Sequence, residues 1–252
     1  MTYHAFLRAR RRVFPLIVAI AALAIAPWTL PRIASGQSTT SATAMKIGII
    51  GSGNIGGTVG TLWVKAGHPV LFSSRHPEEL KPLVDGLGPL ARAGTVADAL
   101  TFGEVIFIGV PYGAYPQLGK DYAREFNGKI VLDAGNAVLA RDGEIAKEAR
   151  ENGIGFTSAK YLPGARIVRA FNTMNFRRLA SNANRPGDRM AIPIAGDDRD
   201  ALAVAQQLVR YAGFDPVIIG GLESAKLFAQ GGPLYGQDIT AKEMHERLKT
   251  LR

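Results

Sequence analysis

The sequence predicts an α/β fold in which helices cover both faces of a doubly wound, mostly parallel sheet. Three observations carry this prediction. Short, nearly all-apolar runs recur along the chain, as expected of strands that are buried on both faces. Helical stretches alternate with these runs, which is typical of parallel sheets. The first apolar run leads directly into a glycine-rich turn and then a helix, which is a common entry to a nucleotide site.

The glycine-rich turn lies between a predicted strand, Ile47–Ile50, and a helix predicted from about Ile55 to Ala66. Gly51, Gly53 and Gly56 form the pattern G-x-G-x-x-G. These glycines permit a tight turn, leave room for a pyrophosphate and allow close packing of helix on strand, while the helix N-terminus attracts an anion. The turn therefore predicts a Rossmann-type dinucleotide site. A purely structural strand-turn-helix unit is the alternative.

The second predicted strand, Pro69–Phe72, is followed by Ser73-Ser74-Arg75-His76. Enzymes that use NAD usually carry an acidic residue at this place, where it binds the ribose 2′-hydroxyl. Here two hydroxyls and a guanidinium stand instead, and arginine binds phosphate through paired hydrogen bonds. Ser74 and Arg75 therefore predict NADP rather than NAD. In the alternative interpretation Arg75 only covers the strand end in a solvated turn.

Further elements follow from the same patterns. A short helix is predicted over Glu78–Val84, and another begins at Thr95 or Asp98. The later strands are predicted at Glu104–Val110, Lys129–Asp133, Ile167–Phe171, Met190–Gly196 and Pro216–Ile219. A helix is predicted over Arg199–Tyr211 with Asp197 or Asp198 as its cap, so this carboxylate pair is not assigned to catalysis or metal binding.

Beyond the last strand, two C-terminal helices are predicted over Gly220–Gln230 and Ile239–Leu248. The second is amphipathic. This short appendage closes a substrate pocket, forms a homodimer contact or covers a sheet edge, and the sequence leaves these alternatives open.

Composition excludes several classes of function. The chain has 252 residues, a formal net charge of +9 and no cysteine, so thiolate nucleophiles, disulfides and iron-sulfur clusters are excluded. Five of the 30 Lys and Arg residues lie in the first 36 residues, leaving 25 basic against 21 acidic residues in the rest. With that modest excess, no nucleic-acid partner is expected. None of the four histidines has a second ligand at metal-binding spacing. No metal site and no catalytic side chain are therefore assigned.

The first 36 residues have the layout of an export signal. Arginines at 8 and 10–12 precede an apolar stretch from Val13 to Leu30, and small residues follow it. Arg11-Arg12-Val13-Phe14 resembles the twin-arginine signature. We therefore expect an exported, periplasmic protein without a stable membrane span once the signal is cleaved. An uncleaved N-terminal membrane anchor is the alternative.

Six short motifs occur together and in order, and this set resembles the family of coenzyme F420-dependent NADP reductases and the NADPH-binding domain of the STEAP metalloreductases. The motifs are the glycine loop, Ser74-Arg75, Val110-Pro111-Tyr112, Leu132-Asp133-Ala134-Gly135-Asn136, Arg169-Ala170-Phe171-Asn172-Thr173 and Ile194-Ala195-Gly196-Asp197-Asp198. The resemblance covers residues 45–235. The Ala-Phe-Asn-Thr turn combined with Ser-Arg is its more specific part.

The resemblance implies an NADP(H) molecule laid across the strand ends. Its phosphates would lie at Ser52, Gly53, Asn54 and Ile55, its 2′-phosphate at Ser74 and Arg75, and its nicotinamide near Val110, Pro111 and Asn136. The second reactant, a coenzyme F420, a flavin or another small electron acceptor, would stack near Tyr112, Phe171, Asn172 and Thr173.

The predicted organisation is an export signal (1–36), a disordered linker (37–44), an NADP-binding domain (45–219) and a helical appendage (220–252). The predicted function is an NADP(H)-dependent oxidoreductase that transfers hydride between nicotinamide and a small acceptor. The alternative is a non-catalytic NADP(H)-binding module, because a Rossmann fold does not by itself establish turnover.

Overall fold

The structure is a computed structural model, and it describes residues 44–251. The predicted export signal and all but the last residue of the predicted linker lie outside the described residues. Within residues 44–251, no helix has the length and apolar character needed to cross a bilayer.

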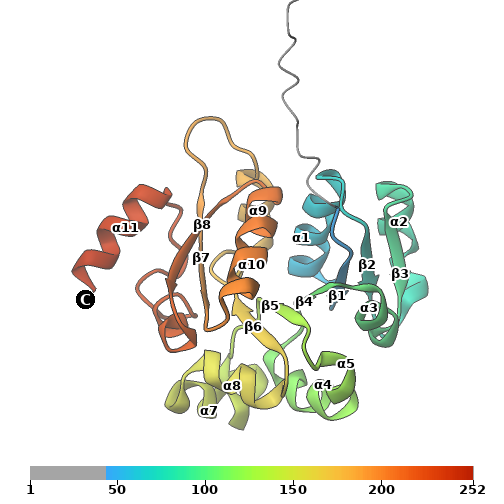
Figure 1. The fold of residues 1–252 in the computed structure, drawn as a ribbon, viewed down its shortest axis with the longest axis horizontal. Coiled ribbons are helices and arrows are strands. Elements are labelled where there is room, and N and C mark those ends of the chain that lie inside the picture. The colour runs from blue at the N-terminus through green and yellow to red at the C-terminus, as the bar shows by residue number, and fades with distance from the viewer. Residues whose placement is uncertain (1–43, 252) are drawn as a thin grey trace, which may run out of the picture. The chain divides into compact units, whose positions relative to one another are not determined.

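One sheet of eight strands organises the described part of the chain, in the order β3-β2-β1-β4-β5-β6-β7-β8 (Figure 1). All neighbouring strands are parallel except β6 and β7, which are antiparallel. The fold is therefore the predicted doubly wound, mostly parallel sheet. The strands are β1 (Ile47–Ile50), β2 (Val70–Ser73), β3 (Ala91–Gly94), β4 (Val105–Ile108), β5 (Ile130–Asp133), β6 (Arg166–Arg169), β7 (Ala191–Gly196) and β8 (Asp215–Gly220).

Helices cover both faces of this sheet, and each face has its own core. Alternate residues of one strand enter the two cores: Ile49 packs on the first face and Ile50 on the second. The first face is covered by α1 (Asn54–Lys65), α2 (Lys81–Leu87), α9 (Phe176–Asn182) and α10 (Arg199–Tyr211). The second is covered by α3 (Val96–Phe102), α4 (Tyr115–Asp121), α5 (Ala123–Phe126), α7 (Glu144–Asn152), α8 (Ile154–Tyr161) and α11 (Ala241–Thr250). Burial on both faces explains why the central strands are apolar throughout.

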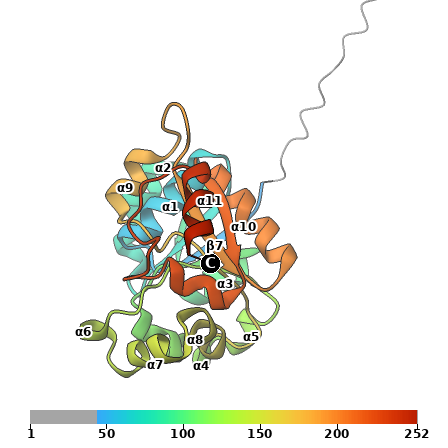
Figure 2. The same cartoon turned by 90° about the vertical axis from the view of Figure 1, so that its left-hand side faces the viewer.

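Short helical turns complete the fold: η1 (Pro77–Leu80), η2 (Tyr112–Ala114), α6 (Leu139–Asp142) and η3 (Leu222–Leu227). Figures 1 and 2 both show α4, α5, α7 and α8 gathered at one end of the molecule's folded part. Helices α7 and α8 and the turn η3 together line a cavity beside the loop that follows β5.

Two predicted helix starts are confirmed. Asp198 caps α10, and its carboxylate accepts hydrogen bonds from the backbone N–H groups of Asp200 and Ala201 at 3.0 and 2.9 Å. It also forms a paired ion contact with Arg166 at 2.6 Å. Thr95 begins α3 in a reciprocal capping arrangement with Asp98, which satisfies two otherwise unpaired N–H groups.

Several features differ from the prediction. The strand β3 has the sequence Ala-Arg-Ala-Gly without an apolar run and was not predicted, and neither were the helices α4 to α9. The predicted helix over 220–230 is only the short 3₁₀ turn η3, in a segment that contains Gly220 and Gly221. The amphipathic α11 is confirmed, with Met244 and Leu248 buried against the second face.

Phe171 links the strand ends to the first core. It follows β6 with a φ of 60°, a left-handed conformation that costs energy for a bulky side chain. Its ring makes edge-to-face contacts with Trp63, Phe107 and Phe214 at centroid distances of 5.8, 6.1 and 6.2 Å. The positive φ turns the chain after β6, and the ring contacts stabilise this strained conformation.

We expect Phe171→Ala to lower the free energy of unfolding by about 3–5 kcal/mol, because a buried aromatic ring is lost. Phe171→Gly should destabilise less than Phe171→Ala, by about 1 kcal/mol, because glycine adopts positive φ without strain. Urea denaturation of both variants measures this order. A glycine variant less stable than the alanine variant would show that the backbone conformation stores no strain.

Candidate functional site

The loops that follow β1, β2, β4, β5 and β6 lie along one edge of the sheet, because these strands are parallel and in register. Ile50 pairs with both Ser73 and Ile108, and Asp133 pairs with both Ile108 and Arg169. The strand order reverses between β1 and β4. Ligands of open α/β sheets bind in the crevice at such a reversal. The structure thus brings the predicted cofactor residues to one edge.

The three loop glycines meet three different requirements. Gly51 has a φ of 92°, and a Cβ there would lie 2.5 Å from a side-chain carbon of Val110. A Cβ on Gly56 would lie 2.1 Å from the carbonyl oxygen of Gly51, so α1 packs too closely on the loop for any side chain. A Cβ on Gly53 would meet no protein atom within 4 Å. Gly53 is therefore not required by packing, and its open space suits an approaching ligand.

The N-terminus of α1 faces this open space without a protein anion to neutralise it. Gly53 is its cap residue, no side chain caps the helix, and its first turn holds no acidic residue. Next to it, the hydroxyl of Ser52 is buried and has no hydrogen-bond partner within the described residues. Unpaired donors and the helix dipole together favour a phosphate. Asn54 and Ile55 form the first turn.

The end of β2 presents Ser74 and Arg75. The hydroxyl of Ser74 accepts a hydrogen bond from the backbone N–H of His76 at 3.0 Å, which shapes the turn. The side chain of Arg75 is exposed, and the imidazole of His76 lies 3.4 Å from Glu78. An exposed guanidinium at this edge is accessible to an anionic ligand.

The loops after β4 and β5 supply the predicted nicotinamide residues. Val110 is partly buried and Pro111 is exposed. The side-chain amide of Asn136 donates to the carbonyl oxygen of Asn172 at 2.6 Å, and the amide of Asn172 donates back to Asn136 at 3.3 Å and to the carbonyl of Phe228 at 3.2 Å. These contacts join the ends of β5 and β6.

The residues predicted to stack on a second reactant are all buried, which corrects that part of the expectation. The rings of Tyr112 and Phe171 are completely enclosed, and Asn172 and Thr173 are almost so. The Tyr112 hydroxyl donates to the carbonyl of Ile154 at 3.0 Å, and burial raises the pKa of this phenol. Tyr112 packs in the second core and Phe171 in the first, so neither ring has a surface that a reactant can contact.

A buried ion pair that the sequence analysis did not assign lies below these loops. Arg169 and Asp133, at matched positions of β6 and β5, are 2.6 Å apart and fully buried. Burial alone would lower the pKa of Arg169, but Asp133 and the nearby phenols raise it instead. Asp133 also accepts hydrogen bonds from the hydroxyl of Tyr115 and the N–H of Gly135, whose carbonyl accepts from Arg169. The pair thus fixes the backbone directly before Asn136.

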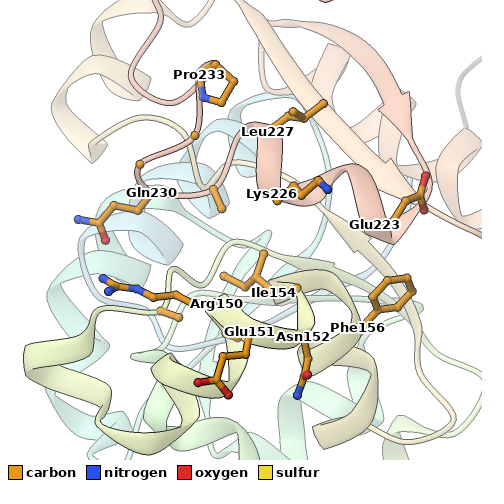
Figure 3. Close-up of a pocket in the computed structure, with 16 residues that line it drawn as sticks. Arg150, Glu151, Asn152, Ile154, Phe156, Glu223, Lys226, Leu227, Gln230 and Pro233 are labelled. Atoms are coloured by element: carbon orange, nitrogen blue, oxygen red, sulfur yellow. The ribbon is translucent and has the colours of Figure 1, made fainter. Parts of the chain in front are cut away.

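A cavity with a volume of about 800 Å³ lies between α7–α8 and the segment from η3 to Pro233 (Figure 3). One wall falls in the segment 220–230, for which the sequence analysis left closure of a substrate pocket open as one alternative, whereas the wall from α7 and α8 was not assigned. The wall includes apolar Ile154, Phe156, Leu227 and Pro233, with Arg150, Lys226 and Gln230 among its polar residues. Figure 3 shows Ile154 and Leu227 on opposite walls, and Arg150 below Gln230.

This cavity borders the predicted nicotinamide end of the site. Ala137 lines it and directly follows Asn136. Ala229 lines it from the other wall and directly follows Phe228, whose carbonyl binds Asn172. The cavity volume lies in the range of small-molecule sites, about 300–1,000 Å³. The cavity therefore adjoins the loop that follows β5 at the strand-end edge.

Comparison with known proteins agrees with this arrangement. Residues 46–137 match the family model described as NADP oxidoreductase, coenzyme F420-dependent. Metalloreductase STEAP3 of Rattus norvegicus is 31% identical over 188 residues, which make up 73% of this chain and 35% of that protein. The chain thus spans about a third of the length of the curated relatives it matches.

Two solved structures share the fold. A hypothetical protein from Sinorhizobium meliloti is 27% identical with a TM-score of 0.66, covering 78% of this chain and 95% of that chain. A putative F420-dependent NADP reductase from an Arthrobacter species is 22% identical with a TM-score of 0.56, covering 72% of this chain and 87% of that chain. The chain thus shares its fold with these solved structures, and its residues 46–137 are similar to the family described as NADP oxidoreductase, coenzyme F420-dependent.

Proposed function

We propose that this chain is an NADP(H)-dependent oxidoreductase that transfers a hydride between nicotinamide and a small electron acceptor. The observation that carries the proposal is the juxtaposition of a glycine loop with open space at Gly53, on the strand-end edge, and a cavity of about 800 Å³ that adjoins the same edge. The first suits the cofactor and the second suits an acceptor. NADPH, when bound, supplies a hydride, which carries two electrons.

The residues present fit NADP(H). Gly53 leaves space that a Cβ would fill, and the buried Ser52 hydroxyl lacks a partner within the described residues; both suit a pyrophosphate at the N-terminus of α1. Ser74 and Arg75 at the end of β2 suit the 2′-phosphate. Val110, Pro111 and Asn136 would border the nicotinamide, because they lie at the ends of β4 and β5 beyond the strand-order reversal.

The acceptor would occupy the cavity between α7–α8 and η3 rather than a position against the rings of Tyr112 and Phe171, which are buried. Ile154 and Leu227 on facing walls suit a planar ring, and Arg150 and Lys226 add polar groups. Hydride transfer needs closeness, alignment and exclusion of water more than a proton relay. A flavin-like, deazaflavin-like or similar acceptor meets these conditions. Because the relatives are named metalloreductases, ferric complexes are also worth testing. Each ferric ion accepts one electron, so one NADPH would reduce two of them and release a proton.

The proposal predicts NADPH oxidation by the purified protein with at least one acceptor from a panel of flavins, deazaflavins and ferric complexes. Loss of the nicotinamide absorbance measures it. Because Phe156 lines the cavity and is partly exposed, Phe156→Ala should raise the acceptor KM and leave the affinity for NADPH unchanged. NADPH binding without turnover on any acceptor would instead favour a non-catalytic NADP(H)-binding module.

Gly53→Ala tests the pyrophosphate position without disturbing the fold. The backbone φ of −72° suits alanine, and the new methyl group meets no protein atom within 4 Å. We expect the free energy of unfolding to change by less than about 1 kcal/mol, while NADPH affinity falls at least about tenfold because the methyl group occupies ligand space.

Gly86→Ala is the matched control for that experiment, because Gly86 lies in α2 and a Cβ there is also free of contacts. This variant should bind NADPH like the wild type. Equal affinities of the Gly53→Ala variant and the wild type, measured by fluorescence titration, would place the pyrophosphate elsewhere.

Arg75→Asp tests the 2′-phosphate assignment. We expect NADPH affinity to fall by about tenfold to a hundredfold, because a charge-assisted hydrogen bond is lost, while NADH affinity changes little. Arg124→Asp is the control, since exposed Arg124 lies in α5, before β5 and hence at the opposite edge of the sheet. Equal losses for NADPH and NADH in the Arg75 variant would contradict the assignment.

A further inference from the structure

Two consecutive residues at the end of α6, Arg141 and Asp142, join the loops that follow β4 and β5. The Asp142 carboxylate accepts a hydrogen bond from the N–H of Gly113, beyond β4, at 3.1 Å. Its other oxygen accepts from the N–H of Val138, beyond β5, at 2.8 Å. One carboxylate therefore spans the two loops, and its side chain is only 1% exposed.

Arg141 adds a third link to the same carboxylate. Its guanidinium donates to both oxygens of Asp142 at 2.8 Å and to the carbonyl oxygen of Asn136 at 2.7 Å. Burial opposes ionisation of Asp142, but these bonds from Arg141, Val138 and Gly113 outweigh it and lower the pKa of the carboxyl. The carboxylate therefore stays charged at neutral pH, as the paired geometry with arginine requires.

Asn136 is consequently held from two sides. Its carbonyl binds Arg141, and its side-chain amide binds the carbonyl of Asn172 at the end of β6. The residue on which the nicotinamide assignment depends therefore has a fixed backbone and a fixed side chain. Its neighbour Ala137 lines the acceptor cavity, so a shift of this loop would change the spacing between cofactor and acceptor.

We propose that Arg141 and Asp142 are positioning residues that hold the loops after β4 and β5 in the arrangement that receives the nicotinamide. This inference rests on the proposed NADP(H) function. It adds two residues with no place in the glycine loop, the 2′-phosphate site or the cavity lining. Small displacements of a reacting ring lower transfer rates steeply, because hydride transfer depends on close alignment.

Two ligands separate this positioning role from a general structural one. NADPH carries the nicotinamide, whereas 2′-phospho-ADP-ribose has the same phosphates and adenosine but no nicotinamide. Arg141→Gln should weaken NADPH binding about tenfold, because hydrogen bonds that hold Asn136 and orient Asp142 are lost. Its affinity for 2′-phospho-ADP-ribose should stay within about twofold of the wild type. Because the Arg141 side chain is 47% exposed, this variant is expected to fold.

Lys147→Gln is the matched control, since it removes an exposed positive charge from the neighbouring helix α7. It should leave both affinities unchanged. Asp142→Asn is a second variant that keeps the side-chain shape while weakening the charged contacts, and it should show the same selective loss for NADPH. Fluorescence and calorimetric titrations measure these affinities.

Equal weakening of both ligands in the Arg141 variant would overturn the positioning role, because it would show general loosening of the site. Unchanged binding of both ligands would overturn it as well. A wild-type protein that binds neither nucleotide would remove the proposed function and this inference together, so the two failures are distinguishable.

Discussion

The buried ion pair between Asp133 and Arg169 is the contact on which the geometry of the strand-end edge depends. Taking both charges out of water costs several kcal/mol, which their attraction and hydrogen bonds offset only when the geometry is good. Here Asp133 also accepts hydrogen bonds from the hydroxyl of Tyr115 and the N–H of Gly135, and Arg169 donates to the carbonyl oxygen of Gly135. The pair leaves the backbone between β5 and Asn136 one favourable arrangement, because any shift would expose an unpaired buried charge.

Further hydrogen bonds connect this ion pair to the neighbouring loops. Gly135 precedes Asn136, and Asn136 joins the end of β6 through Asn172. Asn172 in turn donates to the carbonyl of Phe228, which ties in the segment after η3. Hydrogen bonds between buried polar groups are strong and help to rigidify a structure. The edge proposed to receive the nicotinamide is thus built on a connected polar network, whereas the phosphate loop at β1 relies on glycine packing.

The structure also shows that the aromatic residues of the short motifs pack in the cores rather than facing a reactant. Phe171 was expected to face a reactant, but its ring fills the first core against Trp63. Tyr112 packs in the second core, where it reaches the first residue of α8. The aromatic residues of these motifs therefore pack in the cores beneath the site and stabilise the loops that form it. The cavity proposed for the acceptor is lined instead by α7, α8 and the segment after η3, which no short motif marks.

The sequence by itself determined the doubly wound sheet, the glycine loop and the cap at Asp198, because each depends on local patterns: apolar runs, glycine spacing and a polar residue before a helix. Only the tertiary structure decided the Asp133–Arg169 pair, the Arg141–Asp142 contacts and the cavity, since these join residues from different loops and helices. Phe171 was predicted as the last residue of a strand, but β6 ends at Arg169, and the positive φ of Phe171 sets the direction of its side chain. The direction of a side chain at a strand end depends on the residues that pack around it. These residues come from distant parts of the chain, so they leave no repeating pattern in the sequence.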